Sequence, residues 1–374
     1  MIEQMTKETK IKLASVQLTA EQENAVLEVL RSGQIVAGLK VELFEAQLKK
    51  ITNRKHVVAV SSGTAALLAA MKALGVGRGS VVVVPAFTFP APAMTASLLG
   101  AKVKICDVNR DTLNICVETL SEVLDSTVTH VVAIDQFGMP APVSEIEDLL
   151  SNTNIPVLVD AACSLGSFLN GSPCGSSGRV SIFSFHPRKV VTTGEGGAVL
   201  TDDDNIARFV RRFRNLGIED GAFINAGLNL RPSEIGAAFG LIQLKNLDDI
   251  VKKRVDLAAR YQQVSLRKQQ PLKGSSPNYQ TFAALLPDAM GETDRASLLT
   301  FLKTNGVQGQ VASYCLGALN SFSRKLGIDK SYVPTALQAH NAGVALPLHD
   351  KMNAEDVDFV ANLVQDWLEI QGAL

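Results

Sequence analysis

The segment from Ser181 to Asp202, SIFSFHPRKVVTTGEGGAVLTD, holds the first candidate for chemistry, Lys189. Apolar runs on both sides predict buried strands, and Lys189 lies between them among small hydroxyl residues and glycines. Close to apolar surface an ammonium group is disfavoured, and the neutral amine that replaces it can attack a carbonyl carbon. The context therefore makes Lys189 a candidate for a Schiff-base lysine, although most lysines of any chain are solvated and have no such role.

A carboxylate follows another apolar run. The sequence PVLVD at residues 156–160 predicts a strand that ends in Asp160. In an open parallel sheet, ligands bind beyond the carboxyl ends of the strands. Pyridoxal phosphate needs an acidic partner that keeps its pyridine nitrogen protonated, because the protonated ring is the better electron sink. Asp160 fits that role, and a plain helix cap is the alternative interpretation of the same residue.

The third feature is a loop of small residues, SSGTAA at 61–66. The pattern predicts a strand that turns through Ser, Gly and Thr into a helix. The first N–H groups of a helix and its dipole attract phosphate, although an ordinary capped helix would have a similar sequence. Neither GxxxxGKS/T nor GxGxxG occurs, so the usual loops for nucleotide hydrolysis and dinucleotide binding are absent from the sequence.

The elements that would position these residues alternate along the chain. Apolar runs predict strands at residues 56–60, 80–84, 101–106, 130–134, 156–159, 197–200 and 281–286. Helical periodicity is found at residues 19–48 with a break at 31–33, and at 63–74, 233–263, 295–304 and 354–369. This alternation predicts an α/β fold with a mostly parallel sheet covered by helices on both faces.

The chain is long enough for more than one domain. Its 374 residues include a polar, turn-rich segment at 268–278, KQQPLKGSSPN, which is the linker candidate. We expect a large α/β domain at residues 1–250 and a small C-terminal α+β domain at residues 251–374, which includes a connecting helix.

Composition excludes several classes of protein. Lys plus Arg number 36 against 37 for Asp plus Glu, and aromatic residues make up 5%, which argues against nucleic acid as a partner. The longest charge-free stretch, residues 79–101, contains three prolines, and no signal peptide is visible, so we expect no membrane segment. Five cysteines without a CxxC pair argue against a disulfide framework or a zinc site. These features predict a cytoplasmic protein without a metal.

Five segments together resemble one known family: SSGTAA (61–66), PAFTFPAPA (85–93), VDAACSLGS (159–167), SFHPRKVVTTGEGGAVLTDD (184–203) and LNLRPSEIGAAFGLIQL (228–244). They are similar to the DegT/DnrJ/EryC1/StrS aminotransferases, which are sugar aminotransferases among the fold type I pyridoxal phosphate enzymes. The resemblance runs in order from about residue 37 to the C-terminus. It implies the fold type I architecture and pyridoxal 5′-phosphate as cofactor.

The resemblance also implies roles for individual residues. The residues that match its cofactor positions are Gly63, Thr64, Ala65, Phe89, Asp160, Cys163, Ser184, Lys189 and Asn229. Lys189 matches the Schiff-base lysine and Asp160 the partner of the pyridine nitrogen. The segment 63–65 and Ser184 match phosphate-binding positions, and the ring at position 89 matches an aromatic that stacks on the cofactor. The position of Asn229 reaches the phosphate from a neighbouring subunit, which implies a homodimer with shared active sites.

The implied reaction moves an amino group from an amino acid, with glutamate as the expected donor, to a keto-sugar that is expected to be nucleotide-linked. The departures from the family pattern lie where substrate is chosen. Cys163 stands where many members have Gln or His, and Gln34 where an aromatic is frequent. Asp135-Gln136-Phe137-Gly138 replaces the familiar HLYG, and residues 312–317, ASYCLG, replace the Pro-Leu-His run of the small domain.

Three alternatives remain open on the sequence. A dehydratase branch of the family has His in place of the lysine, which Lys189 argues against. Cysteine desulfurases share the fold and use a mobile cysteine, for which Cys315 is a candidate, although a buried cysteine is often only a small hydrophobic residue. A regulator that retains the cofactor without turnover is the third alternative, and a steady-state assay distinguishes it from an enzyme.

Overall fold

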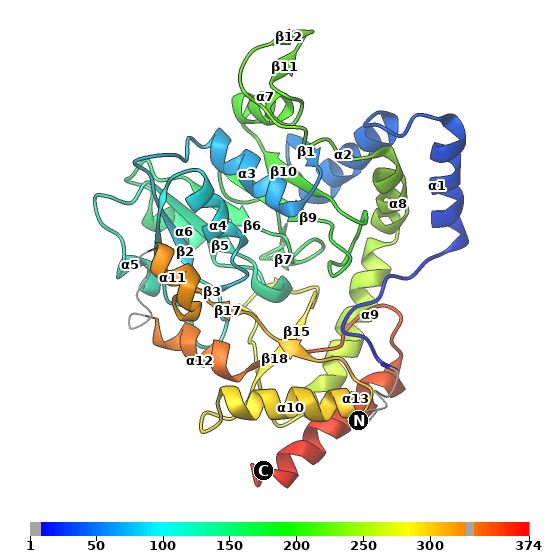
Figure 1. Cartoon of the computed structure of the whole chain (residues 1–374), viewed down its shortest axis with the longest axis vertical. Helices are drawn as coiled ribbons and strands as arrows, with labels where there is room; N and C mark the ends of the chain where they lie inside the picture. Colours follow the sequence, from blue (N-terminus) through cyan, green and yellow to red (C-terminus); the bar gives the residue numbers. More distant parts are fainter. Residues whose placement is uncertain (1–8, 327–332, 374) are drawn as a thin grey trace, which may run out of the picture.

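A seven-stranded sheet forms the centre of the computed structural model, which describes residues 9–326 and 333–373 (Figure 1). In spatial order its strands are β1 (His56–Val60), β10 (Gly197–Thr201), β9 (Val180–Ser184), β6 (Val157–Asp160), β5 (His130–Ile134), β2 (Val81–Pro85) and β4 (Lys102–Cys106). Strand β10 runs antiparallel to both of its neighbours, and the other pairs are parallel. The predicted mostly parallel α/β sheet is confirmed, and the strand bounds differ from the expected ones by at most one residue.

Helices cover both faces of this sheet. One face packs against α3 (Gly63–Ala73), α4 (Ala91–Leu98) and α7 (Asp204–Phe213). The other packs against α2 (Leu39–Thr52), α5 (Val117–Ser121), α6 (Val143–Leu149) and α8 (Glu234–Lys245), and α1 (Ala20–Ser32) lies against α8. Successive strand residues point to opposite faces, so Val58 joins the first core and Val57 the second. The near-continuous apolar strands in the sequence reflect this double coverage.

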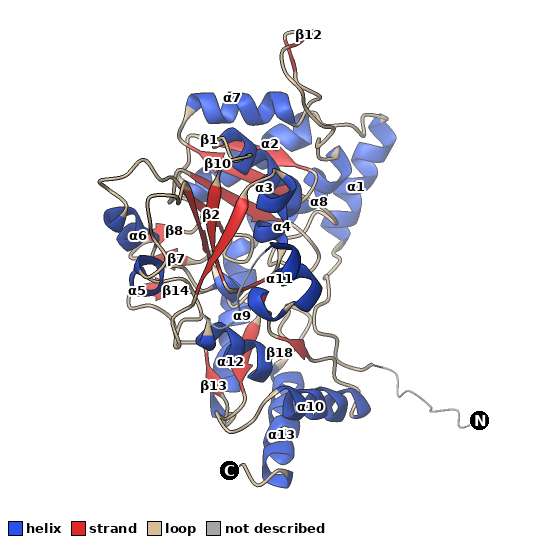
Figure 2. Ribbon diagram, turned by 60° about the vertical axis from the view of Figure 1, so that its left-hand side comes forward, coloured by secondary structure: helices blue, strands red, loops and turns tan. Residues whose placement is uncertain are grey.

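A smaller α+β unit follows along α9 (Leu247–Arg260) and lies below the large sheet in Figures 1 and 2. Its antiparallel sheet has the order β13 (Arg267–Lys268), β15 (Phe282–Leu285), β18 (Gly343–Leu346) and β16 (Gln310–Val311). Around it pack α10 (Glu292–Thr304), α12 (Pro334–Ala342) and α13 (Ala354–Ile370). The helix expected over 233–263 is broken at Asn246 into α8 and α9 and ends in the 3-10 turn η2 (Tyr261–Gln263).

Short pairings join the two units. Strand β17 (Tyr314–Cys315) pairs with β3 (Phe87–Thr88), and β14 (Ser275–Ser276) pairs with β7 (Phe168–Leu169), which also pairs with β8 (Ser172–Pro173). The remaining described elements are the hairpin β11 (Ile218–Glu219) and β12 (Ala222–Phe223), the 3-10 turns η1 (Gln136–Gly138) and η3 (Leu316–Ala318), and α11 (Asn320–Leu326). The division at residue 250 stays a prediction.

The polar segment 268–278 packs only partly against the large unit: Gln269 and Asn278 are buried, whereas Gln270, Lys273 and Ser276 are exposed. The buried side chains find hydrogen-bond partners, and the role of the segment as a linker stays a prediction. Gln269 Nε2 donates to the carbonyls of Thr112 and Gln136, and Asn278 is completely buried. Within residues 9–326 and 333–373, no helix combines the length and apolar character needed to cross a membrane.

Candidate active site

A cavity of about 390 Å³ opens where β6 and β9 end, at the carboxyl edge of the parallel strands. Predicted site residues from four separate segments line it: Gly63, Thr64, Phe89, Asp160, Cys163, Ser184 and Lys189. Ala65 and Asn229 are outside the lining. The sheet therefore brings together residues that are far apart in sequence, at the edge where α/β sheets bind ligands.

The N-terminus of α3 forms one end of the cavity. Ser62 caps this helix, because its Oγ accepts the Ala65 N–H at 3.0 Å. Gly63 and Thr64 donate their N–H groups to no described residue, so these two donors are available to a phosphate. The Ala65 N–H, which was also expected to bind phosphate, is already engaged by Ser62.

Two glycines allow the end of β9 and the start of β10 to lie close to the N-terminus of α3. A Cβ on Gly63 would lie 2.7 Å from the Cβ of Ser184, and a Cβ on Gly197 would lie 2.4 Å from the Ser62 carbonyl oxygen. The end of β9 and the start of β10 thus touch the capped end of α3 only because both positions lack a side chain. The predicted phosphate-binding hydroxyl of Ser184 is placed beside the free N–H groups by this packing.

Asp160 is the last residue of β6, and its carboxylate is buried. Its Oδ1 accepts the Ala162 N–H at 3.1 Å, and its other oxygen has no hydrogen-bond partner among the described residues. Burial raises the pKa of Asp160, while the positive charge of Lys189 acts in the opposite direction. A buried carboxylate with one unpaired oxygen is suited to accept a hydrogen bond from a ring N–H⁺ of a ligand.

Lys189 follows β9 in a turn closed by its own N–H, which donates to the His186 carbonyl at 2.8 Å. Its Nζ lies 3.1 Å from the Sγ of Cys163, the only side chain of the described residues to which this amine donates. The amine therefore reaches the cavity between the β6 loop and the β9 loop. A nucleophilic amine, a buried carboxylate and a free helix N-terminus are the donor set that fits pyridoxal phosphate.

Sequence reasoning did not assign roles to Arg188 and Gln280, which line the cavity, or to Asn278, which supports the loop beside it. Among the described residues, the Arg188 guanidinium has no hydrogen bond or ion pair. Burial is the main cause that lowers the pKa of the His186 imidazole, and the charges of Lys189 and Arg188 lower it further. The charge of Glu195 opposes this shift. Position 188 stands inside the SFHPRK motif, which was the signal that could have found it.

Gln280 and Asn278 had no such signal. Gln280 lines the cavity and donates from Nε2 to the Arg188 carbonyl at 2.6 Å. Asn278 Nδ2 donates to the carbonyls of Cys163 and Leu165, each at 2.9 Å, and so holds the loop after Asp160. These partners are about a hundred residues away in sequence, and no local sequence pattern predicts such a contact.

Other residues singled out in the sequence lie elsewhere. Asn229 is exposed, forms an isolated bridge with Asn215, and keeps its role toward a neighbouring subunit as a prediction. Cys315 is fully buried in β17 and does not line the cavity. Gln34 is exposed in the segment between α1 and α2. Across the described ranges no group of His, Cys, Asp and Glu side chains has the arrangement of a metal site.

Comparisons with known proteins agree with this geometry. The model of the DegT/DnrJ/EryC1/StrS aminotransferase family matches residues 16–365. GDP-perosamine synthase from Vibrio cholerae is 28% identical over 336 residues, which cover 88% of this chain and 91% of that protein. The aminotransferase TlmJ from Streptoalloteichus hindustanus is 28% identical with a TM-score of 0.90, over 97% of this chain and 100% of that one. Spr1654 from Streptococcus pneumoniae, described as a sugar aminotransferase in its PLP form, shares the fold at 22% identity and a TM-score of 0.90, over 96% and 98% of the two chains.

Proposed function

We propose that this chain, which belongs to the DegT/DnrJ/EryC1/StrS aminotransferase family, moves an amino group from glutamate to a nucleotide-linked keto-sugar. Its cofactor is pyridoxal 5′-phosphate. The observation that carries the proposal is the single cavity that holds the Lys189 amine, the Asp160 carboxylate and the free N–H groups of α3. A relative that makes GDP-perosamine and a cavity with an unpaired guanidinium both support an anionic, nucleotide-linked acceptor.

The residues present fit the cofactor. Gly63 and Thr64 would hold its phosphate through their N–H groups and Ser184 through its hydroxyl, at the positive end of α3. Asp160 would accept from the pyridine nitrogen and Phe89, whose side chain is 65% exposed, would cover the ring. Lys189 would hold it covalently through Nζ, with the Cys163 thiol beside that atom.

When bound, pyridoxal phosphate supplies an electron-poor ring that stabilises negative charge at a neighbouring carbon. The protein's own part is acid–base chemistry and positioning. Once its amine is free, Lys189 would take the proton from the α-carbon of the donor as general base and deliver it to the C4′ carbon of the cofactor as general acid. Asp160 would place its carboxylate at the ring nitrogen without reorganisation, because the Ala162 N–H in the loop after β6 holds it in place.

Arg188 is our candidate for recognising the anionic part of the substrates. Its guanidinium faces the same cavity as Lys189, and its backbone is held by Gln280. The planar fork of Arg binds carboxylate or phosphate oxygens with two parallel hydrogen bonds. Ser313 and Tyr314 line the wall contributed by the small unit and supply hydroxyl groups for a sugar.

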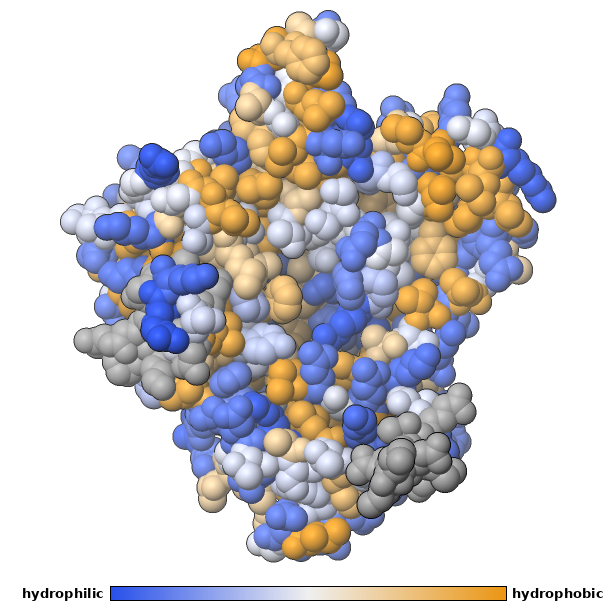
Figure 3. Space-filling view, viewed as in Figure 1, coloured by the Kyte–Doolittle hydropathy of each residue, from blue (hydrophilic) through white to orange (hydrophobic). Residues whose placement is uncertain are grey.

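We further propose a homodimer with shared sites, in keeping with the position of Asn229. Apolar side chains are exposed on α1, α2 and the segment between them, a surface we call the α1–α2 patch: Leu27, Leu30, Ile35, Val36, Leu39 and Leu43. A second apolar surface is the β11–β12 arm, with Phe223 and Ile224. Both are visible as orange areas at the upper right and the top of Figure 3. Exposed apolar area of this kind is typical of a protein–protein interface, and a two-fold axis would use it twice.

Cytoplasmic location belongs to the same proposal. Cys106, Cys116, Cys163 and Cys174 form no disulfide in the structure, as expected where thiols stay reduced.

Borohydride reduction tests the assignment of Lys189. Reduction of the loaded protein should fix the cofactor to the peptide that contains Lys189, and labelling of another lysine would refute the assignment. Lys189→Ala should keep the fold and lose turnover. Addition of glutamate alone to wild-type protein should change the cofactor's visible spectrum and release 2-oxoglutarate, and no release would remove glutamate as donor.

A mixed dimer tests the shared site. In a dimer of one Lys189→Ala chain and one Asn229→Ala chain, one site would carry both defects and the other neither, so activity should approach half that of the wild-type dimer. If Asn229 acted within its own chain, both sites would be damaged and little activity would remain.

A further inference from the structure

Gln136 is a buried polar residue to which the proposed reaction gives no role. It is the first residue of η1, is 6% exposed, and lines the active-site cavity. Its side-chain amide has no hydrogen-bond partner among the described residues. By contrast, the amide of Gln280 in the same cavity donates to the Arg188 carbonyl and accepts from the Thr281 hydroxyl. Gln136 therefore offers two N–H donors and one acceptor oxygen to a ligand that fills the cavity.

The backbone around Gln136 is held on both sides, which gives the side chain a fixed starting point. Its N–H donates to Asn114 Oδ1 at 3.0 Å, and its carbonyl accepts from Gln269 Nε2 at 3.1 Å. The next residue, Phe137, has a φ of 63°, in the left-handed region that a bulky side chain rarely adopts. Strain of this kind persists only where the surrounding contacts fix the backbone, and it is frequent at ligand sites.

Gln136 and the phosphate-binding end of the cavity lie on opposite sides of Asp160. Strand β6, which ends in Asp160, lies between β9 and β5 in the sheet. Ser184 ends β9 and packs against Gly63 at the N-terminus of α3. On the other side, the Asp135 N–H donates to the Asp160 carbonyl at 3.1 Å, directly before Gln136. A ring held between α3 and Asp160 therefore has the turn after β5 as its neighbour on the remaining side.

Positions 136 and 163 both depart from the family pattern, and in opposite directions. Cys163 stands where many members have Gln or His, and Gln136 stands where the HLYG motif has Leu. The two positions lie on loops that touch, because Asp135 Oδ2 is 2.5 Å from the Oγ of Ser164. A thiol is a weak hydrogen-bond donor, and the Sγ of Cys163 already accepts from Lys189 Nζ at 3.1 Å. The strong donor that position 163 lacks in this chain is thus present at position 136.

We propose that the Gln136 amide donates a hydrogen bond to the phenolic oxygen of bound pyridoxal phosphate, in place of the Gln or His that many family members have at position 163. The inference rests on the proposed cofactor roles of Asp160, Lys189 and the N-terminus of α3. Those groups account for the ring nitrogen, the carbonyl carbon and the phosphate, and they leave the phenolic oxygen without a partner. An amide N–H stabilises the ionised form of that oxygen. A bound ring also displaces water from the cavity, so the buried amide needs a partner on the ligand.

The visible absorbance of the bound cofactor tests this contact without turnover. Gln136→Leu introduces the residue of the HLYG motif and removes the donor. The pH at which the absorption band changes should rise by about 1 pH unit, because the ionised phenolic oxygen loses a hydrogen bond. Cofactor affinity should fall roughly 10-fold in the same variant. Gln310→Leu is the matched control, since Gln310 lines the same cavity from the small unit, and neither property should change there.

The double variant Gln136→Leu/Cys163→Gln carries the residues that many family members have at the two positions. It should recover the wild-type pH dependence and affinity, which a variant that is merely misfolded would not do. A double variant no better than Gln136→Leu alone would overturn the proposal. So would an unchanged cofactor titration of Gln136→Leu together with a raised KM, because the amide would then contact the substrate.

Failure of the inference is distinguishable from failure of the proposed function. If the wild-type protein does not bind pyridoxal phosphate, the proposed function is refuted. If wild type and Gln136→Leu bind it with equal affinity and equal pH dependence, only the role of Gln136 is refuted.

Discussion

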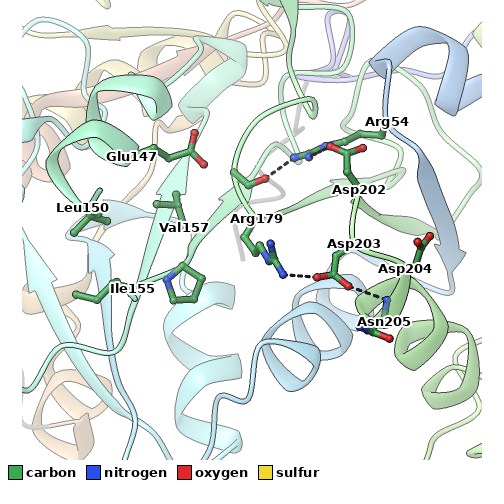
Figure 4. Close-up of a pocket in the computed structure, with 12 residues that line it drawn as sticks. Arg54, Glu147, Leu150, Ile155, Val157, Arg179, Asp202, Asp203, Asp204 and Asn205 are labelled. Atoms are coloured by element: carbon green, nitrogen blue, oxygen red, sulfur yellow. Dashed lines mark hydrogen bonds and ion pairs between the residues drawn. The ribbon is translucent and has the colours of Figure 1, made fainter. Parts of the chain in front are cut away.

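Two hollows lie at opposite edges of the central sheet. The cavity at the carboxyl ends of β6 and β9 has a volume of about 390 Å³, and a groove at the amino ends of the same strands has about 660 Å³ (Figure 4). In the groove Arg54 pairs with Asp202 and Arg179 with Asp203. In the cavity the Arg188 guanidinium and one oxygen of Asp160 have no partner among the described residues. The smaller hollow is the better ligand site, because its charged groups are not already neutralised by one another.

The largest effect on catalysis is expected from a substitution of Asp160 in the cavity. Asp160→Asn removes the charge at nearly constant volume, and kcat should fall by roughly 10²–10³-fold, the loss expected when one preorganised charge-stabilising group is removed. Phosphate contacts at α3 are unaffected, so the variant should still bind the cofactor in a spectral titration. Normal turnover would reduce the carboxylate to a cap for the following loop.

Arg54 should show the opposite behaviour. Its guanidinium is buried and donates to the carbonyls of Gly175, Ser177 and Gly178 as well as to Asp202. Arg54→Met keeps an apolar stem but leaves these buried acceptors without a hydrogen-bond donor. This should lower the free energy of unfolding by about 3 kcal/mol. Denaturant unfolding measures this loss, while kcat/KM of the folded fraction should not change. A large fall in kcat/KM would show that the groove takes part in the reaction.

Arg188 and Arg179 form a matched pair of arginines, one in each hollow. Arg188→Gln should raise KM by roughly 10–100-fold, because a hydrogen bond to a charged group contributes ~1.5–3 kcal/mol. Arg179→Gln is the control, since its exposed ion pair with Asp203 should leave both KM values unchanged. A rise in the KM of the amino donor alone would assign Arg188 to the donor carboxylate, and a rise for the acceptor alone to its phosphates. Equal kinetics of the two variants would remove Arg188 from substrate recognition.

The smallest effect is expected at Glu147 in the groove. Burial raises its pKa, the charge of Arg54 opposes that rise, and Asp148 adds to it. A carboxyl with a raised pKa in the folded state loses stability as pH rises through its titration range. Glu147→Gln should therefore be more stable than wild type at pH 8 by at most about 0.5 kcal/mol. The two proteins should have similar stability at pH 4, and a Tm difference that grows toward low pH would contradict this sign.

The large sheet could be predicted because each of its strands is a run of consecutive apolar residues in the sequence. Apolar runs such as residues 130–134 fill strands that are buried on both faces, and the loop after each strand carries the motif residues. Lys189 and Asp160 could be found for the same reason, since each follows directly on such a run. The antiparallel direction of β10 was not visible, because a five-residue apolar strand reads the same in either orientation.

The rest of the cavity depends on contacts between distant segments. Asn278 ends a stretch whose composition is that of a loop, and only the fold shows that its amide is surrounded by the carbonyls of residues 163 and 165. Arg254 is similar: it lies in an amphipathic helix, yet it is buried and donates to the carbonyls of Gln280 and Leu348. Polar side chains are usually exposed, and hydrogen bonding makes burial favourable at both positions.

The path of residues 275–281 has a consequence for engineering. This short stretch belongs by sequence to the C-terminal part of the chain, yet β14 pairs with β7, Asn278 clamps the loop after Asp160, and Gln280 holds Arg188. An exchange of C-terminal parts between relatives would therefore import a piece of the wall around the reacting groups. A chimera joined after residue 281 keeps the host's own clamp, whereas one joined at residue 250 sets a foreign clamp against a loop that did not evolve with it.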